Sequence, residues 1–180
     1  DPHISDDGRY VIFQTQARAS ASDLNNSNDI YRKDTQTGEL RLVSVGLDGL
    51  AAGGENAQLS ADGRYVSFIS AGQLSNPDPG NDYILTETPI RAVYRADLQT
   101  GAVAIASVAA NGTLPNRASF SATISDDGRF LLFKTDGDNF DGAQGVAFGG
   151  TFPAYTSGDP SVYLKDMLTG TLTPVDDNGA

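Results

Sequence analysis

Short apolar runs alternate with polar turn segments along this chain, and the runs recur at regular intervals. Three of them share one pattern, Ser-x-Asp-Gly-Arg followed by an aromatic residue and an apolar stretch that ends in Phe, at Ser5 to Phe13, Ser60 to Phe68 and Ser125 to Phe133. Aromatic and β-branched residues directly after a turn signal predict a β-strand. In the first and third copies both faces of the strand are apolar, which is typical of a strand covered on two sides.

Each copy continues with a second shared pattern, in which Tyr is followed by Asp and then by Thr-Gly. It occupies Tyr31 to Gly38, Tyr94 to Gly101 and Tyr163 to Gly170. Gly supplies the positive φ that closes a hairpin, and Asp accepts hydrogen bonds from the backbone of its own turn. We therefore predict a strand on either side of this turn, at 29–34 and 40–44 in the first copy, 92–97 and 103–107 in the second, and 161–166 and 171–176 in the third.

A further short strand is expected before each Asp-Gly turn, most clearly at 56–60 and 119–125. This makes four antiparallel strands per repeat, which is the content of one propeller blade. Repeats of this period bury their apolar faces by stacking on their neighbours. The predicted fold is an all-β propeller segment, a single domain of three four-stranded antiparallel blades, with repeat units at approximately 1–48, 49–111 and 112–180.

The repeats differ mainly in the length of one connection. The Tyr of the second pattern follows the Phe of the first by 18, 26 and 30 positions in successive copies. In a four-stranded meander the two tight turns lie at one end of the sheet, so this connection shares the other end with the linkers between blades. Variable loops on a fixed scaffold are where binding usually occurs.

The composition of the chain excludes some classes of binding partner. The chain carries 12 Lys and Arg against 23 Asp and Glu, a formal charge of -11. Apart from the adjacent Arg32 and Lys33, the basic residues are scattered singly, which argues against nucleic acid, since a phosphate-binding surface needs clustered cations. There is no Cys, so disulfides and thiolate ligands are excluded. No apolar run approaches the roughly 20 residues that a membrane-spanning helix needs.

The repeated patterns resemble the TolB-type, WD-like β-propeller repeats of bacterial secreted, periplasmic and surface proteins. The first copy matches that signature at Ser5-Asp6-Asp7-Gly8-Arg9 with Phe13, and again from Asp29-Ile30-Tyr31 to Gly38; the other two copies match nearly as well. The chain departs from the pattern in its long connections and in Ala92 and Ser161, where Asp is common. The resemblance implies a secreted, cell-surface or periplasmic location, and a scaffold that serves as a protein-binding, peptidase-gating or carbohydrate-binding module.

Three blades are fewer than the roughly 4–8 that close a propeller. The expected partners therefore include further blades from a longer chain, or a second copy that completes the ring, because two apolar sheet faces would otherwise stay open. The first residue, Asp1, follows no Met or leader, and this favours a processed secreted form or a piece of a longer polypeptide.

Candidate metal ligands lie in the longest connection. Asp136, Asp138 and Asp141 have a spacing that could surround Ca²⁺ with hard oxygen ligands, although Phe140 stands where an EF-hand loop would place oxygen and no Glu follows. The alternative is a solvated Asp-rich turn. Similar but weaker clusters occupy 23–29 and 76–82. Ca²⁺ is the only cofactor that the sequence suggests.

The remaining candidates are a binding surface and several residues with structural interpretations. Phe148, Phe152 and Tyr155 form the best candidate for an exposed aromatic surface that contacts a protein or a glycan. The single histidine, His3, is expected to belong to the first inner strand. No catalytic residues are assigned; the repeated Asp34, Asp97 and Asp166 are interpreted as turn-forming residues, the repeated Arg9, Arg64 and Arg129 as bonding within or between blades, and the repeated Tyr31, Tyr94 and Tyr163 as packing residues with a hydroxyl partner.

Three hypotheses of function follow. The first is a non-enzymatic secreted or cell-surface module that makes protein or glycan contacts through its long loops. The second is the propeller part of a larger hydrolase, such as a prolyl-oligopeptidase-like peptidase, with its catalytic residues elsewhere. The third is an oligomer or filament in which the open blade faces form the interface.

Overall fold

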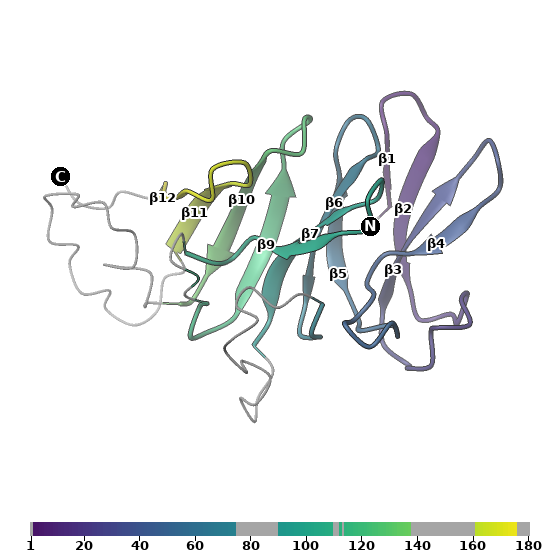
Figure 1. The fold of residues 1–180 in the computed structure, drawn as a ribbon, viewed down its shortest axis with the longest axis horizontal. Coiled ribbons are helices and arrows are strands. Elements are labelled where there is room, and N and C mark those ends of the chain that lie inside the picture. The colour runs from purple at the N-terminus through teal and green to yellow at the C-terminus, as the bar shows by residue number, and fades with distance from the viewer. Residues whose placement is uncertain (1, 75–89, 110–111, 113, 138–160, 176–180) are drawn as a thin grey trace, which may run out of the picture.

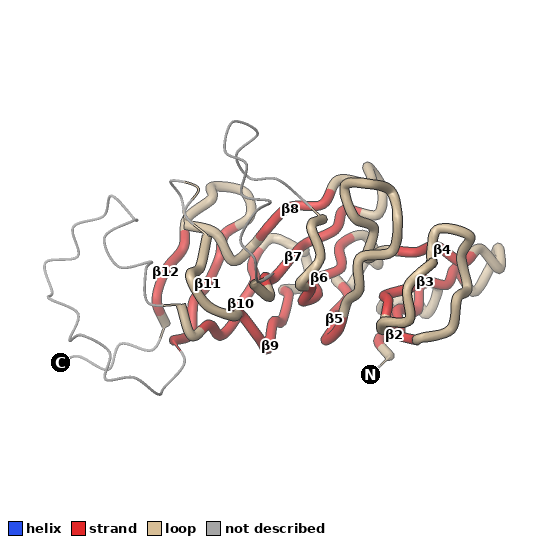
Figure 2. Tube along the Cα trace, turned by 90° about the horizontal axis from the view of Figure 1, so that it is seen from below, coloured by secondary structure: helices blue, strands red, loops and turns tan. Residues whose placement is uncertain are grey.

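A computed structural model describes residues 2–74, 90–109, 112, 114–137 and 161–175. They form three separate four-stranded sheets arranged side by side, and the tube in Figure 2 contains only strands and loops in the described part. The first sheet contains β1 (His3–Ile4), β2 (Tyr10–Thr15), β3 (Asp29–Asp34) and β4 (Leu40–Leu42); the second contains β5 (Glu55–Leu59), β6 (Tyr65–Ser70), β7 (Ala92–Asp97) and β8 (Val103–Ile105); the third contains β9 (Ser119–Ile124), β10 (Phe130–Thr135), β11 (Ser161–Asp166) and β12 (Leu172–Pro174). None of the described segments is a helix that could cross a membrane.

Each sheet is an antiparallel meander, with its strands paired in sequence order. The pairing register repeats between sheets: Phe13 lies opposite Tyr31, as Phe68 lies opposite Tyr94 and Phe133 opposite Tyr163. In all three pairs the rings stack, with centroids 5.9–6.1 Å apart. The prediction of three four-stranded antiparallel blades is confirmed, and the array is unclosed (Figure 1).

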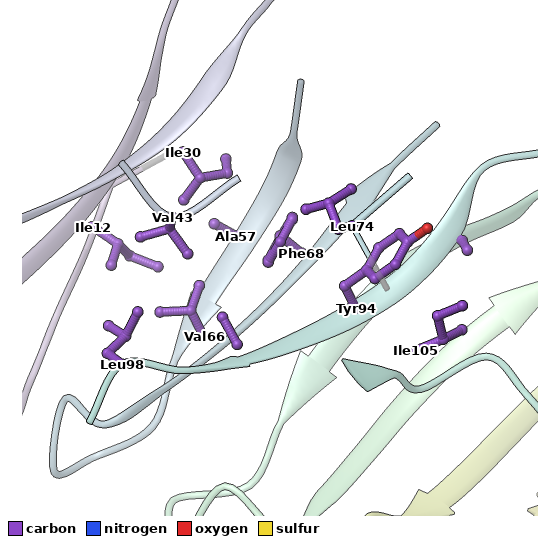
Figure 3. Close-up of a cluster of buried hydrophobic side chains, with 12 residues drawn as sticks. Ile12, Ile30, Val43, Ala57, Val66, Phe68, Leu74, Tyr94, Leu98 and Ile105 are labelled. Atoms are coloured by element: carbon purple, nitrogen blue, oxygen red, sulfur yellow. The ribbon is translucent and has the colours of Figure 1, made fainter. Parts of the chain in front are cut away.

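The hydrophobic core lies between neighbouring blades. One cluster joins the first two blades through residues such as Ile12, Ile30 and Phe68, and Figure 3 shows these side chains facing one another across the junction. A second cluster joins the second and third blades through Ile69, Leu131 and others. Because side chains alternate along a strand, the middle blade has two buried faces, and β6 is buried from Val66 to Ser70.

The outermost strand of each blade is shorter than predicted. We expected strands at 40–44, 103–107 and 171–176, whereas the structure ends them at Leu42, Ile105 and Pro174. In the first two blades the reason is local. The N–H of Val45 donates to the carbonyl of Val43, and that of Val108 to Ala106, which turns the chain away from the sheet. The boundaries of the repeat units remain a prediction.

The Asp-Gly turns fix how one blade sits on the next. Gly63 has a φ of +72°, and a Cβ added to it would lie 2.3 Å from Cδ2 of Tyr10 in the preceding blade. Gly128 has the same relation to Tyr65, at 2.1 Å. These positions therefore need Gly for two reasons, the left-handed backbone and the aromatic ring that covers it. Tyr10 and Tyr65, at the start of the second strand of the first two blades, thus pack on the turn of the following blade.

Candidate binding surface at the loop end of the blades

The tight turns at one end of the sheets are held by a hydrogen-bond network that repeats in every blade. In the first blade Oγ of Ser5 donates to Asp7 at 2.6 Å and accepts from the N–H of Tyr10 at 2.9 Å. The N–H of Arg9 also donates to Asp7. These bonds hold the pKa of Asp7 below its ordinary value, the bond from Ser5 having the largest effect. The equivalent bonds recur from Ser60 to Tyr65 and from Ser125 to Phe130.

An Arg–Asp ion pair with two hydrogen bonds joins the two tight turns of each blade. Arg9 donates to Asp34 through Nε and Nη2 at 3.1 and 2.9 Å. The same pair forms between Arg64 and Asp97 and between Arg129 and Asp166. The guanidinium is the main cause that holds the pKa of each of these carboxyl groups far below its ordinary value, and backbone N–H donors of the turn add to it.

This pairing confirms the structural interpretation of the repeated residues. Asp34 also accepts from the N–H groups of Gln36 and Thr37, as a turn-forming residue does. Arg9 also lies 4.8 Å from the ring centre of Tyr10, with Arg32 at 4.6 Å. The bonds of the Arg–Asp pairs are therefore made within blades, and these repeated Arg and Asp side chains are paired with one another.

The other end of the sheets holds the connections of variable length and the linkers between blades. The β2–β3 connection, residues 16–28, lies within the described part of the chain. Asn25 donates from Nδ2 to the carbonyl of Ala51 at 2.9 Å, and the N–H of Ala51 donates to Ser22 at 2.9 Å. These bonds attach the loop to the linker that leads into the second blade.

Two of the repeated tyrosines have hydroxyl partners at this end, as predicted. The hydroxyl of Tyr31 donates to Oδ2 of Asp23 at 2.6 Å, whereas that of Tyr94 donates to the carbonyl of Gly72 at 2.9 Å. Burial is the main cause that raises the pKa of Tyr31 to about 12, followed by its bond to Asp23. Burial likewise raises the pKa of Tyr94 to about 12. Both tyrosines therefore stay neutral and anchor the loops.

Most of the predicted site residues lie outside the described residues. These are Asp138, Asp141, Phe148, Phe152 and Tyr155. Asp136 is described; it is exposed just after β10, and its N–H donates to the carbonyl of Ala118 at 3.0 Å. Within the described ranges no group of three or more His, Asp or Glu side chains could hold a metal ion. The calcium and aromatic-surface hypotheses stay predictions.

His3 lies in β1 opposite Ile12, in the position expected from the sequence. A lysine that the sequence did not single out is more unusual. Lys165 is buried between the second and third blades, where its Nζ donates to the carbonyls of Val108 and Gly170 at 2.7 and 2.8 Å. Burial lowers its pKa to about 8. Lys33 occupies the equivalent position of β3 and is only partly buried, so the repeat pattern does not predict the burial of Lys165.

The two outer faces of the array repeat the surfaces that are buried inside it. Gly8 has a φ of +71°, as Gly63 and Gly128 have, but a Cβ added to it would meet nothing within 4 Å. At the other end Phe130 occupies the position of Tyr10 and Tyr65, and the described chain has no turn beyond it. The aromatic residue and the turn glycine recur at fixed positions in every repeat, and this regularity is the signal in the sequence from which the contact between blades could have been predicted.

Comparison with known proteins identifies the fold of the chain. No protein-family model and no curated protein matches this chain. Among solved structures, TolB from Acinetobacter baumannii has 18% identity and a TM-score of 0.52, with 99% of this chain and 32% of TolB covered. The β-propeller domain of the Trilobed protease from Pyrococcus furiosus has 15% identity and a TM-score of 0.54, with 96% and 40% covered.

A third similar structure is the acylaminoacyl peptidase of Pyrococcus horikoshii, at 14% identity and a TM-score of 0.51, with 96% of this chain and 23% of the peptidase covered. The chain thus spans less than half the length of each of these proteins. At such identities the likeness concerns the fold and not the activity. Three successive four-stranded sheets with this register, and these structural neighbours, give the chain the fold of a TolB-like β-propeller, present here as three blades of an unclosed ring.

Proposed function

We propose that this chain is a non-enzymatic propeller module of a secreted, cell-surface or periplasmic bacterial protein, and that it binds a protein or glycan partner through the loops at one end of its blades. The observation that carries this proposal is the asymmetry between the two ends. The repeated Arg and Asp side chains of the tight turns are paired with one another in all three blades, while the connections at the opposite end change in length from blade to blade. A scaffold of this kind presents its variable loops to a partner.

A loop-exchange experiment on the intact protein tests the proposal. Residues 138–158 are replaced by Asn-Gly, and the matched control changes the exposed turn at the other end, Gln36→Ala. Binding is then measured to an array of glycans and to immobilised outer-surface proteins. We expect the loop replacement to abolish binding and Gln36→Ala to leave it intact. Binding that survives the loop replacement, or that is lost with Gln36→Ala, would contradict the proposal.

A second candidate function is the substrate-access propeller of a larger hydrolase. It is favoured by the likeness to the propeller domain of the Trilobed protease and to acylaminoacyl peptidase. The intact protein is incubated with a fluorophosphonate probe, which labels activated serine nucleophiles. Labelling of a segment outside these 180 residues would favour the hydrolase, and a protein that stays unlabelled favours the binding module.

We also propose that further blades complete the ring. The N–H of Asp6 donates to the carbonyl of Ala61 at 2.9 Å, and the N–H of Ala61 donates to Asp126 at 3.0 Å. The same donor and acceptor therefore connect successive blades, and Asp126 is the next donor in that series. Native mass measurement separates the two sources of the further blades: a monomer means that one chain supplies them, and a dimer means that a second copy does.

A further inference from the structure

Two buried carboxylates in the first blade each have an oxygen without a hydrogen-bond partner. Asp23 is 2% exposed; its Oδ2 accepts from Tyr31, and its Oδ1 has no partner. Asp29 is 0% exposed; its Oδ1 accepts from Oγ of Ser44 at 2.7 Å and from the N–H of Gly53 at 3.0 Å, and its Oδ2 has no partner. Buried polar atoms are nearly always paired, so two such oxygens in one blade need an explanation.

Neither carboxylate has a cationic partner among the described residues. Arg9, Arg64 and Arg129 pair with Asp34, Asp97 and Asp166 at the opposite end of the sheets, and Arg91 pairs with Glu55. Arg18, in the same loop as Asp23, donates instead to the carbonyl of Asn25 and the side chain of Asn26. Burial of a carboxylate without a counter-charge is strongly unfavourable, and the cost rises when a second one is buried beside it.

Tyr31 relates the positions of the two carboxylates. Its hydroxyl donates to Asp23, and its side chain leaves the same face of β3 as that of Asp29, two residues earlier. Bonds on both sides hold the segment between the two acidic residues. Asn25 donates to Ala51, and the N–H of Gly54 donates to the carbonyl of Asn28 at 2.7 Å.

The second blade shows that the fold itself does not need this arrangement. Ala92 occupies the position of Asp29, and Tyr94 donates to a backbone carbonyl where Tyr31 donates to a carboxylate. Ser107, the counterpart of Ser44, keeps only the bond from the backbone N–H of Val93 at 2.9 Å. The second blade therefore forms without the pair of carboxylates, although Asp at the position of Asp29 is common in the repeats that this chain resembles.

Another protein surface is a poor source of the missing partner, because both unpartnered oxygens are already buried within the blade. A water molecule would supply hydrogen bonds but no positive charge. A small cation supplies both contacts and charge. Oxygen ligands on an irregular loop rich in Asp, Asn and Ser suit Ca²⁺, which accepts six to eight oxygens in flexible geometry.

We infer that the first blade binds Ca²⁺ between Oδ1 of Asp23 and Oδ2 of Asp29, with loop carbonyls and water as the remaining ligands. The ion neutralises the two carboxylates and holds loop 16–28 against the start of β3. This site lies in the cluster 23–29, a weaker candidate from the sequence, and it is separate from the one predicted at Asp136, Asp138 and Asp141. It also does not depend on the proposed binding function, since it concerns the stability of a loop and not the identity of a partner.

Terbium luminescence on the intact protein tests the inference. Tb³⁺ occupies calcium sites and is excited through nearby tyrosine, and Tyr31 lies beside the site. We expect Tb³⁺ binding that Ca²⁺ displaces, and an affinity about tenfold or more lower in Asp23→Asn and Asp29→Asn, because each removes one ligand charge. Asp48→Asn, an exposed acidic residue in the linker, is the matched control and should bind as the parent does.

Circular dichroism first establishes that the variants are folded. Hydrogen exchange on the unaltered protein gives a readout that needs no variant: Ca²⁺ should slow exchange of the amides in 16–28 relative to EGTA. The inference is overturned if Tb³⁺ and Ca²⁺ do not bind, if the two Asn variants bind as tightly as Asp48→Asn, or if Ca²⁺ leaves exchange in this loop unchanged.

Discussion

Three aspartates form the repeated ion pairs at the turn end. Asp34 receives two bonds from Arg9 and two from the backbone of its own turn, and Asp97 and Asp166 receive the equivalent set. Their pKa values are therefore held well below the ordinary 3.8. This link between pairing and pKa makes the contribution of each residue measurable through its pH dependence.

We predict that acid removes the stabilisation by Asp34. The folded-state pKa is depressed, so the contribution is complete above about pH 3.8, the pKa in the unfolded chain, and is lost as pH falls toward the folded-state pKa. Asp34→Asn should therefore be less stable than the parent at pH 7, and the difference should shrink below pH 3.8. Urea unfolding at a series of pH values measures it, with Asp48→Asn as the control. A difference that does not change with pH would contradict the prediction.

We predict a slope of the same sign for Lys165, at higher pH. Its pKa is lowered to about 8 by burial, from 10.5, so the unfolded chain binds more protons between those values and stability should rise with pH there. The useful window is about pH 8 to 10, because Tyr31 and Tyr94 keep pKa values of about 12 and oppose the rise above pH 10. Thermal unfolding of the parent and of Lys165→Met measures the slope. The slope should be absent in the variant; an equal slope in both proteins would exclude Lys165 as its source.

Some of these residue roles could be predicted from the sequence, and others could not. Asp34 and Arg9 recur at one phase of the repeat, and the repetition itself indicates a structural role. Lys165, Asp23 and Asp29 could not be assigned in this way. Whether a polar side chain on a strand or loop is buried depends on what packs against it from the neighbouring blade or linker, and the local pattern does not contain that information.

At the scale of elements, the packing of an aromatic ring on a turn glycine is the contact that sets one blade against the next. We predict that Gly63→Ala destabilises the protein by about 3 kcal/mol, since it combines a left-handed backbone, about 1–2 kcal/mol, with overpacking against Tyr10. Gly49→Ala is the matched control: its φ is +80° but nothing lies within 4 Å, so only the backbone cost of about 1–2 kcal/mol applies. Chemical denaturation compares the two. Equal losses would show that the ring contact has no energetic role.

The elements themselves were largely predictable, and their ends were not. The aromatic and β-branched runs identified the strands, and the Asp-Gly and Thr-Gly signals identified the turns. The outer strands end early because backbone bonds such as the one from Val45 to Val43 compete with the sheet. A bond of this kind leaves no mark in the sequence.

For the whole molecule, Gly8 reports whether another blade precedes the first. If the proposed further blade precedes the first, its aromatic ring covers Gly8, and we predict that in the intact protein Gly8→Ala is as destabilising as Gly63→Ala, about 3 kcal/mol. Denaturation of the two variants side by side measures this. If Gly8→Ala costs no more than Gly49→Ala, no blade packs on this face.

The number of blades in the ring is a property that the sequence of three repeats does not contain. The stacking rule that relates Tyr10 to Gly63 and Tyr65 to Gly128 is the same at every step. It specifies what a neighbour must look like and says nothing about how many neighbours there are.

The hydrogen bonds from Asp6 to Ala61 and from Ala61 to Asp126 all run in one direction along the array. The array of blades is therefore directional: the free backbone group in this series is a carbonyl acceptor at the first blade and an N–H donor at the third. Two such ends of the same kind cannot mate, so growth by gene duplication, or by joining of separate chains, has to proceed in a single sense. Adding or deleting one whole blade leaves the other contacts between blades unchanged. This offers a simple route by which related propellers with different numbers of blades arise.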